Sequence, residues 1–166
     1  MDFTIRPTTE DDWESIRTLR LEMLQDTPMG FAETYEKALT HGEVDWRARG
    51  LRGAGPNTAA YAAIADDGRW IGFMGGMLHE GEPMLIGVYV TPDYRGDAGV
   101  ADALLAAVEH WASQHGDRIL LHVHADNARA RRYYEKRGYT ETGVTVPYIL
   151  NSAETELEMV KPLARR

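Results

Sequence analysis

Cysteine is absent from the chain, and no apolar run is long enough to cross a bilayer. The first residues, MDFTIRP, also lack the basic and apolar segments of a secretion signal. Without cysteine there is no disulfide and no thiol nucleophile, although a serine nucleophile is not excluded. These absences favour a soluble cytoplasmic protein.

Positive charge is also scarce, because 18 lysines and arginines face 26 aspartates and glutamates, giving a formal net charge of −8. This balance disfavours nonspecific binding to nucleic acid or to an anionic membrane, and it suits a cationic substrate better. The 166 residues are enough for one ordinary domain. No repeat, low-complexity segment or linker divides residues 1–166, so we expect a single domain.

Hydrophobic spacing predicts the elements of the first half. We expect a strand at Phe3–Arg6, a capping box at Thr9–Asp12, a helix from Trp13 to Leu24, and a weaker helical stretch within Glu33–Arg49 that Thr40–Gly42 could interrupt. Three strands should follow at Thr58–Ala65, Trp70–His79 and Met84–Val90. The short turns between these strands predict an antiparallel meander, and Gly87 indicates a bulge or a close backbone approach.

The second half alternates strands with helices. We expect a helix from Gly99 to about His115, a strand at Ile119–Ala125, a helix at Ala128–Arg137, and short strands near Tyr139–Thr142 and Thr155–Val160. The strands at 84–90 and 119–125, joined by a crossover helix, form a βαβ unit and should lie parallel. The predicted fold class is therefore α/β (α+β), with a mixed, mostly antiparallel sheet of six to seven strands and about four helices.

The stretch YRGDAGVADALL, residues 94–105, begins with the Arg-Gly-Asp tripeptide of adhesion loops. Adhesion loops belong to exported proteins, and nothing in this chain supports export. Small residues that lead into a helix expose backbone N–H groups at the positive end of the helix dipole, which favours phosphate binding. The simpler alternative is a glycine-rich turn that only starts a helix.

Two familiar phosphate-binding loops do not fit this stretch. A P-loop needs a lysine followed by serine or threonine after its glycines, and that pair is absent. A dinucleotide fingerprint needs Gly-x-Gly-x-x-Gly after the first strand of a parallel sheet, whereas this loop spells GDAGVA and follows meander strands.

Two segments point to a known family. The segment GVYVTPDYRGDAGVADALL, 87–105, resembles the acetyl-CoA-binding motif of the GNAT superfamily of N-acetyltransferases, and NARARRYYEKRGY, 127–139, is similar to its second signature. The order of predicted elements also matches that superfamily from the first strand to the last. One departure is that Arg95 lies four residues before Gly99 instead of three, which we interpret as a loop longer by one residue.

The resemblance implies transfer of an acetyl group from acetyl-CoA to an amine by direct attack, with the two parallel strands splayed apart to admit the pantetheine arm. Backbone groups of the first strand would bind that arm, and the loop would bind the pyrophosphate. The cofactor-binding residues that it implies are Val88, Tyr89, Val90, Arg95, Gly96, Asp97, Ala98, Gly99, Val100, Ala101, Asn127 and Tyr134. The side chain of Asp97 should face solvent, because an inward carboxylate would repel phosphate.

Tyr134 occupies the place where, by the resemblance, a tyrosine protonates the departing CoA thiolate. Tyr133 is expected to pack against the sheet. Asn127 would hydrogen-bond the cofactor, cap the following helix, or do both. The basic residues of the same helix would attract the cofactor or form a solvated helix face; they are Arg129, Arg131, Arg132, Lys136 and Arg137.

The general base that must deprotonate the amine is not assigned by the sequence. Many members of the superfamily carry a glutamate on the strand that corresponds to Met84–Val90, and this strand has none. The candidates are Glu33, Glu82, Tyr89, His122 and His124. His122 and His124 share one strand face, but no third ligand at recognisable spacing accompanies them, so we expect no metal.

The acceptor site is expected, by the resemblance, in residues 24–35 and 143–154. The acceptor would be a small-molecule or peptide amine, and a homodimer is compatible with the superfamily. A noncatalytic CoA-binding sensor or interaction domain on the same fold is the alternative function. A transferase for a longer acyl chain is a third interpretation, which the size of the pocket would decide.

Overall fold

The computed structural model of the chain describes residues 2–96 and 98–164, so the expectations for Asp97 lie outside the described residues. Within those ranges the chain forms seven strands, five α-helices and four 3₁₀ turns. In chain order they are β1 (Phe3–Pro7), η1 (Glu10–Asp12), α1 (Trp13–Asp26), η2 (Pro28–Gly30), α2 (Tyr35–Ala38), α3 (Glu43–Gly50), η3 (Leu51–Ala54), β2 (Thr58–Ala65), β3 (Trp70–His79), β4 (Glu82–Val90), η4 (Pro92–Tyr94), α4 (Val100–Ser113), β5 (Arg118–His124), α5 (Ala128–Lys136), β6 (Thr140–Tyr148) and β7 (Asn151–Pro162).

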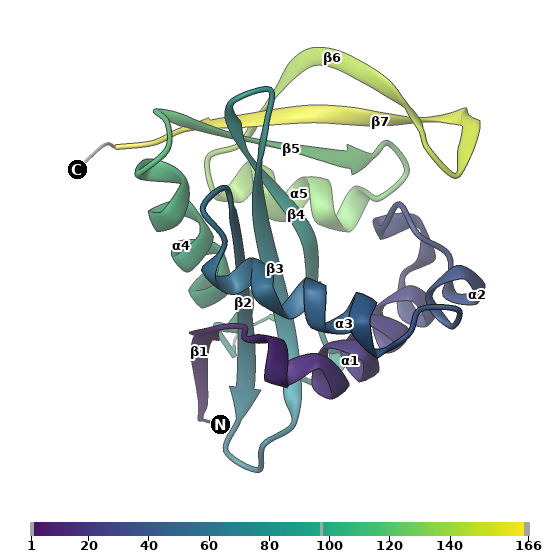
Figure 1. Cartoon of the computed structure of the whole chain (residues 1–166). Helices are drawn as coiled ribbons and strands as arrows, with labels where there is room; N and C mark the ends of the chain where they lie inside the picture. Colours follow the sequence, from purple (N-terminus) through teal and green to yellow (C-terminus); the bar gives the residue numbers. More distant parts are fainter. Residues whose placement is uncertain (1, 97, 165–166) are drawn as a thin grey trace.

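The strands form one sheet in the order β1-β2-β3-β4-β5-β7-β6 (Figure 1). All neighbouring strands are antiparallel except β4 and β5, which are parallel. The predicted mixed α/β fold, with its antiparallel meander and its parallel pair, is confirmed. Since β4 and β5 are joined through α4, the connection between them is the predicted βαβ crossover.

Two hydrophobic clusters cover the two faces of the sheet. The larger cluster contains the apolar stripe of α4 and reaches Tyr134 on α5. The smaller cluster contains the buried side of α1 and Trp46 of α3. As predicted, α1 follows a capping box, in which the N–H of Thr9 donates to Asp12 at 2.8 Å. The helices therefore hold the middle strands from both sides.

The helix α4 packs closely on the sheet because β3 has a glycine beneath it. A Cβ atom at Gly76 would lie 2.6 Å from the Trp111 ring, which is closer than real contacts allow. The predicted stripe is also buried, since Val100, Leu104 and Val108 are fully inaccessible to solvent. Gly72 of β3 lies under Val100 and Leu104 in the same way, so β3 fixes both ends of α4 on the sheet.

The strands β4 and β5 separate soon after they meet. Their only register pair within the described residues joins Met84 to Leu120, and Figure 1 shows the two strands diverging beyond it. On its other edge β4 shifts register against β3 between Phe73 and Gly75, and Gly87 has a φ of +63° at this irregularity. The predicted bulge and the predicted splay are therefore both present.

The C-terminal hairpin is longer than the sequence indicated. The strands were expected near 139–142 and 155–160, but β6 and β7 extend over 140–148 and 151–162. Most of β6 is exposed, so it lacks the alternation of apolar and polar residues that predicts a strand. The strand β6 is held in place by its antiparallel pairing with β7 and not by burial of its side chains. No helix in the described ranges has the length and apolar character needed to span a membrane.

Candidate functional site

A cavity of about 470 Å³ lies between the diverging strands β4 and β5 and the helices α4 and α5. Many of the residues that the sequence singled out line it: Val88, Tyr89, Val90, Arg95, Gly96, Ala101, Asn127 and Tyr134. Ala98, Gly99 and Val100 are not among its lining residues. The structure therefore brings together residues from 88 to 134 that the sequence could only align by resemblance.

The loop before α4 turns on two glycines. Gly96 has a φ of +83° and Gly99 a φ of +78°, both in the left-handed region that favours glycine. Gly99 is the N-cap of α4, and the side chain of Val100 is buried in the core. The first N–H groups of a helix have no acceptor within that helix. This end of α4, at the rim of the cavity, is therefore suited to an anion.

The guanidinium group of Arg95 is already paired. Its Nη2 lies 2.6 Å from Oδ2 of Asp26 on α1, and its Nε donates to the carbonyl of Val90 at 2.7 Å. The hydrogen bond from Arg95 lowers the pKa of Asp26. Arg95 therefore ties the loop to α1, and its net contribution of positive charge to the cavity is small.

Tyr134, which the resemblance placed near the departing sulfur, is buried. Its side chain is 6% exposed, and its ring meets the rings of Tyr133 and Tyr139 edge-on at 5.6 Å. Burial raises the pKa of Tyr134, so the hydroxyl keeps its proton at neutral pH. Tyr133 is half-buried against the same core, and its hydroxyl donates to Asp102 of α4 at 2.8 Å.

The helix α5 supplies the positive charge of the cavity. Arg129, Arg132 and Lys136 of this helix line the cavity, together with Arg137 just after the helix, whose guanidinium group is paired with Asp102 of α4. Arg131 lies elsewhere, donating to the carbonyl of Ala125 and facing Glu141. Asn127 has the capping role, because its Oδ1 accepts from the N–H of Ala130 at 3.2 Å, and it also lines the cavity.

A second cavity of about 490 Å³ adjoins the first on the side of α1 and α3. The two share part of their walls, including Gly87, His122 and Glu156. Phe31, in the segment after α1, lines both cavities, and the hydroxyl of Tyr148 holds that segment by donating to the Phe31 carbonyl at 2.6 Å. The expected acceptor segment 143–154 thus positions the cavity wall and does not line it.

Three of the candidate bases are engaged with other groups. Burial alone would raise the pKa of Glu33, but hydrogen bonds from Arg49, His41 and Arg20 outweigh it and lower the pKa to about 2. Glu82, which is half-buried, forms a two-bond ion pair with Arg118. Burial, followed by the hydrogen bond to Glu22, raises the pKa of Tyr89. None of the three is suited to accept a proton at neutral pH.

The histidines of β5 face glutamates of β7. His122 lies 3.2 Å from Glu158, and His124 lies 2.5 Å from Glu154 while its Nδ1 accepts from the N–H of Asp126. His122 lines both cavities. In the described residues no group of three side chains is arranged to hold a metal ion.

Glu156 is a site residue that the sequence analysis missed. It lines both cavities, stands opposite His124 in the register of β5 and β7, and makes no side-chain hydrogen bond or ion pair among the described residues. The signal was present in the alternation ETELE, 154–158, which puts three glutamates on the strand face that His122 and His124 share. The sequence could not show that these strands are neighbours.

The comparisons with known proteins agree on one family. The acetyltransferase (GNAT) family model matches residues 13–139. An uncharacterized N-acetyltransferase of Methanocaldococcus jannaschii is 31% identical over 108 residues, which cover 64% of this chain and 67% of the relative. The structure of the PaiA N-acetyltransferase from Thermoplasma acidophilum, in complex with coenzyme A, matches with a TM-score of 0.76 at 20% identity, over 98% of this chain and 99% of its own. The ribosomal-protein-S18-alanine N-acetyltransferase from Escherichia coli matches with a TM-score of 0.68 at 20% identity, over 99% and 96%.

Proposed function

The chain belongs to the acetyltransferase (GNAT) family, and from that premise we propose that it moves an acetyl group from acetyl-CoA to a primary amine by direct attack. One observation carries the proposal: a single cavity between separating strands is lined by Val88, Tyr134 and the end of α4. It adjoins a second cavity in which an amine could lie. The chain would therefore hold the donor and the acceptor on the two sides of one opening.

The open edge of β4 fits the pantetheine arm of acetyl-CoA. Beyond Met84 this edge has no ladder partner on β5 within the described residues. An extended chain with amide groups can pair with such an edge through main-chain hydrogen bonds. The carbonyl of Val90 already accepts from Arg95, so Val88 offers the better backbone contacts.

The opposite end of the same cavity fits the phosphates. The N-terminus of α4 offers backbone N–H groups, and three cations of α5 line the wall: Arg129, Arg132 and Lys136. A polyanion approaching a chain with a net charge of −8 needs a local positive potential of this kind. Acetyl-CoA bound here would supply an acetyl group activated as a thioester.

The proton balance of the reaction assigns roles to two groups. The amine loses one proton as the N–C bond forms, and the sulfur gains one as the C–S bond breaks. Tyr134, which stays protonated at neutral pH, would give its proton to the departing sulfur. Glu156, which lies where the cavities meet, would accept the proton of the amine directly or through water, with His122 as the other candidate.

The test is an acceptor screen with acetyl-CoA, read as release of free CoA thiol. Because the protein contains no cysteine, every thiol detected is product. We expect acetyl-CoA to raise the melting temperature and at least one class of primary amine to accelerate thiol release above the acceptor-free control. Stabilisation by acetyl-CoA with no acceleration by any amine would instead identify a noncatalytic CoA-binding sensor.

A further inference from the structure

The second cavity carries an excess of arginine. Three of its lining residues are arginines from three different elements, Arg20 of α1, Arg49 of α3 and Arg52 of η3. The lining carboxylates are Glu33 beside them and Glu156 at the end shared with the first cavity. The wall on this side therefore contributes three positive charges from α1, α3 and η3 and one negative charge, Glu33, from the segment before α2.

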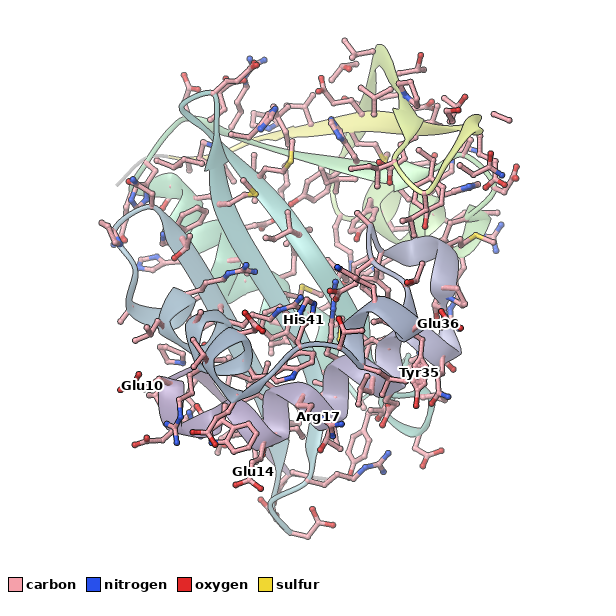
Figure 2. The ribbon with its side chains drawn as sticks, turned by 45° about the vertical axis from the view of Figure 1, so that its right-hand side comes forward. Glu10, Glu14, Arg17, Tyr35, Glu36 and His41 are labelled. Carbon is pink, nitrogen blue, oxygen red and sulfur yellow. The ribbon has the colours of Figure 1, made fainter. Side chains whose placement is uncertain are left out.

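Both carboxylate oxygens of Glu33 have partners within this cluster. Its Oε1 accepts from Arg20 at 3.0 Å, and its Oε2 accepts from Arg49 at 2.8 Å and lies 2.8 Å from the ring of His41 (labelled in Figure 2). The guanidinium group of Arg52 makes no side-chain hydrogen bond or ion pair within the described residues. One carboxylate thus serves two arginines, and the third guanidinium remains available.

The three guanidinium groups carry like charge, and Glu33 offsets it at Arg20 and Arg49 but forms no hydrogen bond with Arg52, which is the exposed member at the cavity. Burial lowers the pKa of both Arg20 and Arg52, and the charge of Arg49 lowers both further. Guanidinium groups pair with carboxylates through two parallel hydrogen bonds, which offset this kind of repulsion. A second carboxylate placed beside Arg52 would complete the cluster.

We infer that the acceptor is an amine that carries a carboxylate, of the free amino acid class, with its carboxylate at Arg52 and Arg49 and its amine toward Glu156. The inference rests on the proposed acetyl transfer and adds the substrate class. This substrate class differs from the one that net charge alone suggests, because a chain with a net charge of −8 should attract cationic acceptors. A polyamine without an acid group would meet the three arginines and be disfavoured by like charge.

The experiment compares acceptors that differ only in the carboxylate. L-phenylalanine is paired with 2-phenylethylamine, and L-methionine with 3-(methylthio)propylamine. We expect kcat/KM to be at least about 10-fold higher for the amino acid of the preferred pair, as a charge-assisted bidentate contact allows. In Arg52→Ala this preference should disappear through a higher KM for the amino acid, with the KM for acetyl-CoA unchanged, and Arg52→Lys should restore part of it.

The control variant is Arg17→Ala, which removes the same charge. Arg17 lies on the surface of α1 beside Thr18 and Leu21, outside both cavities (Figure 2). Its acceptor preference should equal that of the wild type. Equal or better turnover of the amines that lack a carboxylate would overturn the inference and leave the proposed acetyl transfer intact.

A binding measurement separates the inference from the proposed function. If no amine is acetylated, calorimetry with the amino acids alone still reports on the site. Binding by the wild type that is lost in Arg52→Ala would support the carboxylate site although the proposed function had failed. Absence of binding in the wild type as well would overturn the inference.

Discussion

The two cavities on either side of Gly87 are built from different kinds of groups. The first is lined largely by the β4, α4, β5 and α5 segments, and its proposed binding groups are backbone atoms of β4, the N-terminus of α4 and the cations of one helix, α5. The second collects side chains from α1, α3, η3, β3 and β7, and its binding groups are charged side chains. One cavity is thus specified by the geometry of a short, continuous part of the chain, and the other by the assembly of distant parts.

Under the proposed function, this difference separates the binding of acetyl-CoA in the first cavity from the choice of acceptor in the second. Backbone groups at a splayed strand or at the start of a helix keep their positions when the side chains around them are substituted. This holds as long as the glycines and the strand register are retained. Charged side chains such as Arg20 and Arg52 can be exchanged one at a time without disturbing the sheet. Substitutions in the first cavity should therefore affect the use of acetyl-CoA, and those in the second the use of the amine.

The largest effect is expected for Tyr134→Phe in the first cavity. Loss of the hydroxyl removes the proton donor to the departing sulfur, so kcat should fall by about 10²-fold or more, with little change in the KM for acetyl-CoA. Steady-state kinetics measures both constants. The matched control is Tyr133→Phe, which loses only the hydrogen bond to Asp102 and should retain most of kcat. Equal losses in the two variants would contradict the role of Tyr134.

Glu156→Gln tests the proposed proton acceptor where the two cavities meet. The amide keeps the shape of the side chain but cannot accept the proton, so kcat should fall by about 10-fold to 10²-fold, less than for Tyr134→Phe if water relays part of the proton transfer. The control is Glu158→Gln on the same strand, which contacts His122. A larger loss in the control would transfer the base role to His122.

Most of the lining of the first cavity could be named from the sequence because the family resemblance rests on two continuous segments, 87–105 and 127–139. The glycines at 96 and 99, the apolar stripe of α4 and the cap at Asn127 each lie within a few residues of the group that they position. The parallel pair followed from the crossover helix alone. What the sequence missed here was the pairing of Arg95 with Asp26, since that contact joins residues 69 positions apart.

The second cavity could not be predicted because its charges are dispersed. Arg20 and Glu33 are 13 residues apart, and Arg49 and Glu33 are 16 apart, so no spacing rule joins them. The helical pattern around Arg49 is also weak, and the interruption at Thr40–Gly42 separates α2 from α3. Glu156 was missed for a related reason: it lay inside the expected strand 155–160, but the sequence did not show that this strand pairs with β5 opposite His124. Only packing of these segments on the sheet brings the charges together.

The cluster of Glu33 with Arg20, Arg49 and His41 should make the free energy of unfolding depend on pH. The folded pKa of Glu33 is lowered from 4.5 to about 2, so its ionised form stabilises the native state above pH 4.5 and that stability is lost as the pH falls through about 2. By the free energy of each pKa unit, the loss is on the order of 3 kcal/mol. Urea unfolding at a series of pH values measures it.

Glu33→Gln should be less stable than the wild type at pH 7 and should lose less stability between pH 5 and 2, because the titrating group is gone. The control is Glu14→Gln on the exposed surface of α1 (Figure 2), which should follow the wild-type curve. Parallel curves for the wild type and Glu33→Gln would show that the cluster contributes no pH-dependent stability.

The smallest effect is expected at the residue that looks most like a phosphate ligand in the sequence. Arg95→Ala should raise the KM for acetyl-CoA by only a few-fold, because Asp26 already neutralises the guanidinium group in a partly exposed ion pair, and such pairs contribute about 1 kcal/mol or less. Asp26→Asn should act in the opposite direction, since it frees the charge of Arg95 and lowers that KM. Weaker acetyl-CoA binding in Asp26→Asn would contradict this expectation. It would mean that the ion pair helps binding more by positioning the loop than it hinders binding by neutralising Arg95.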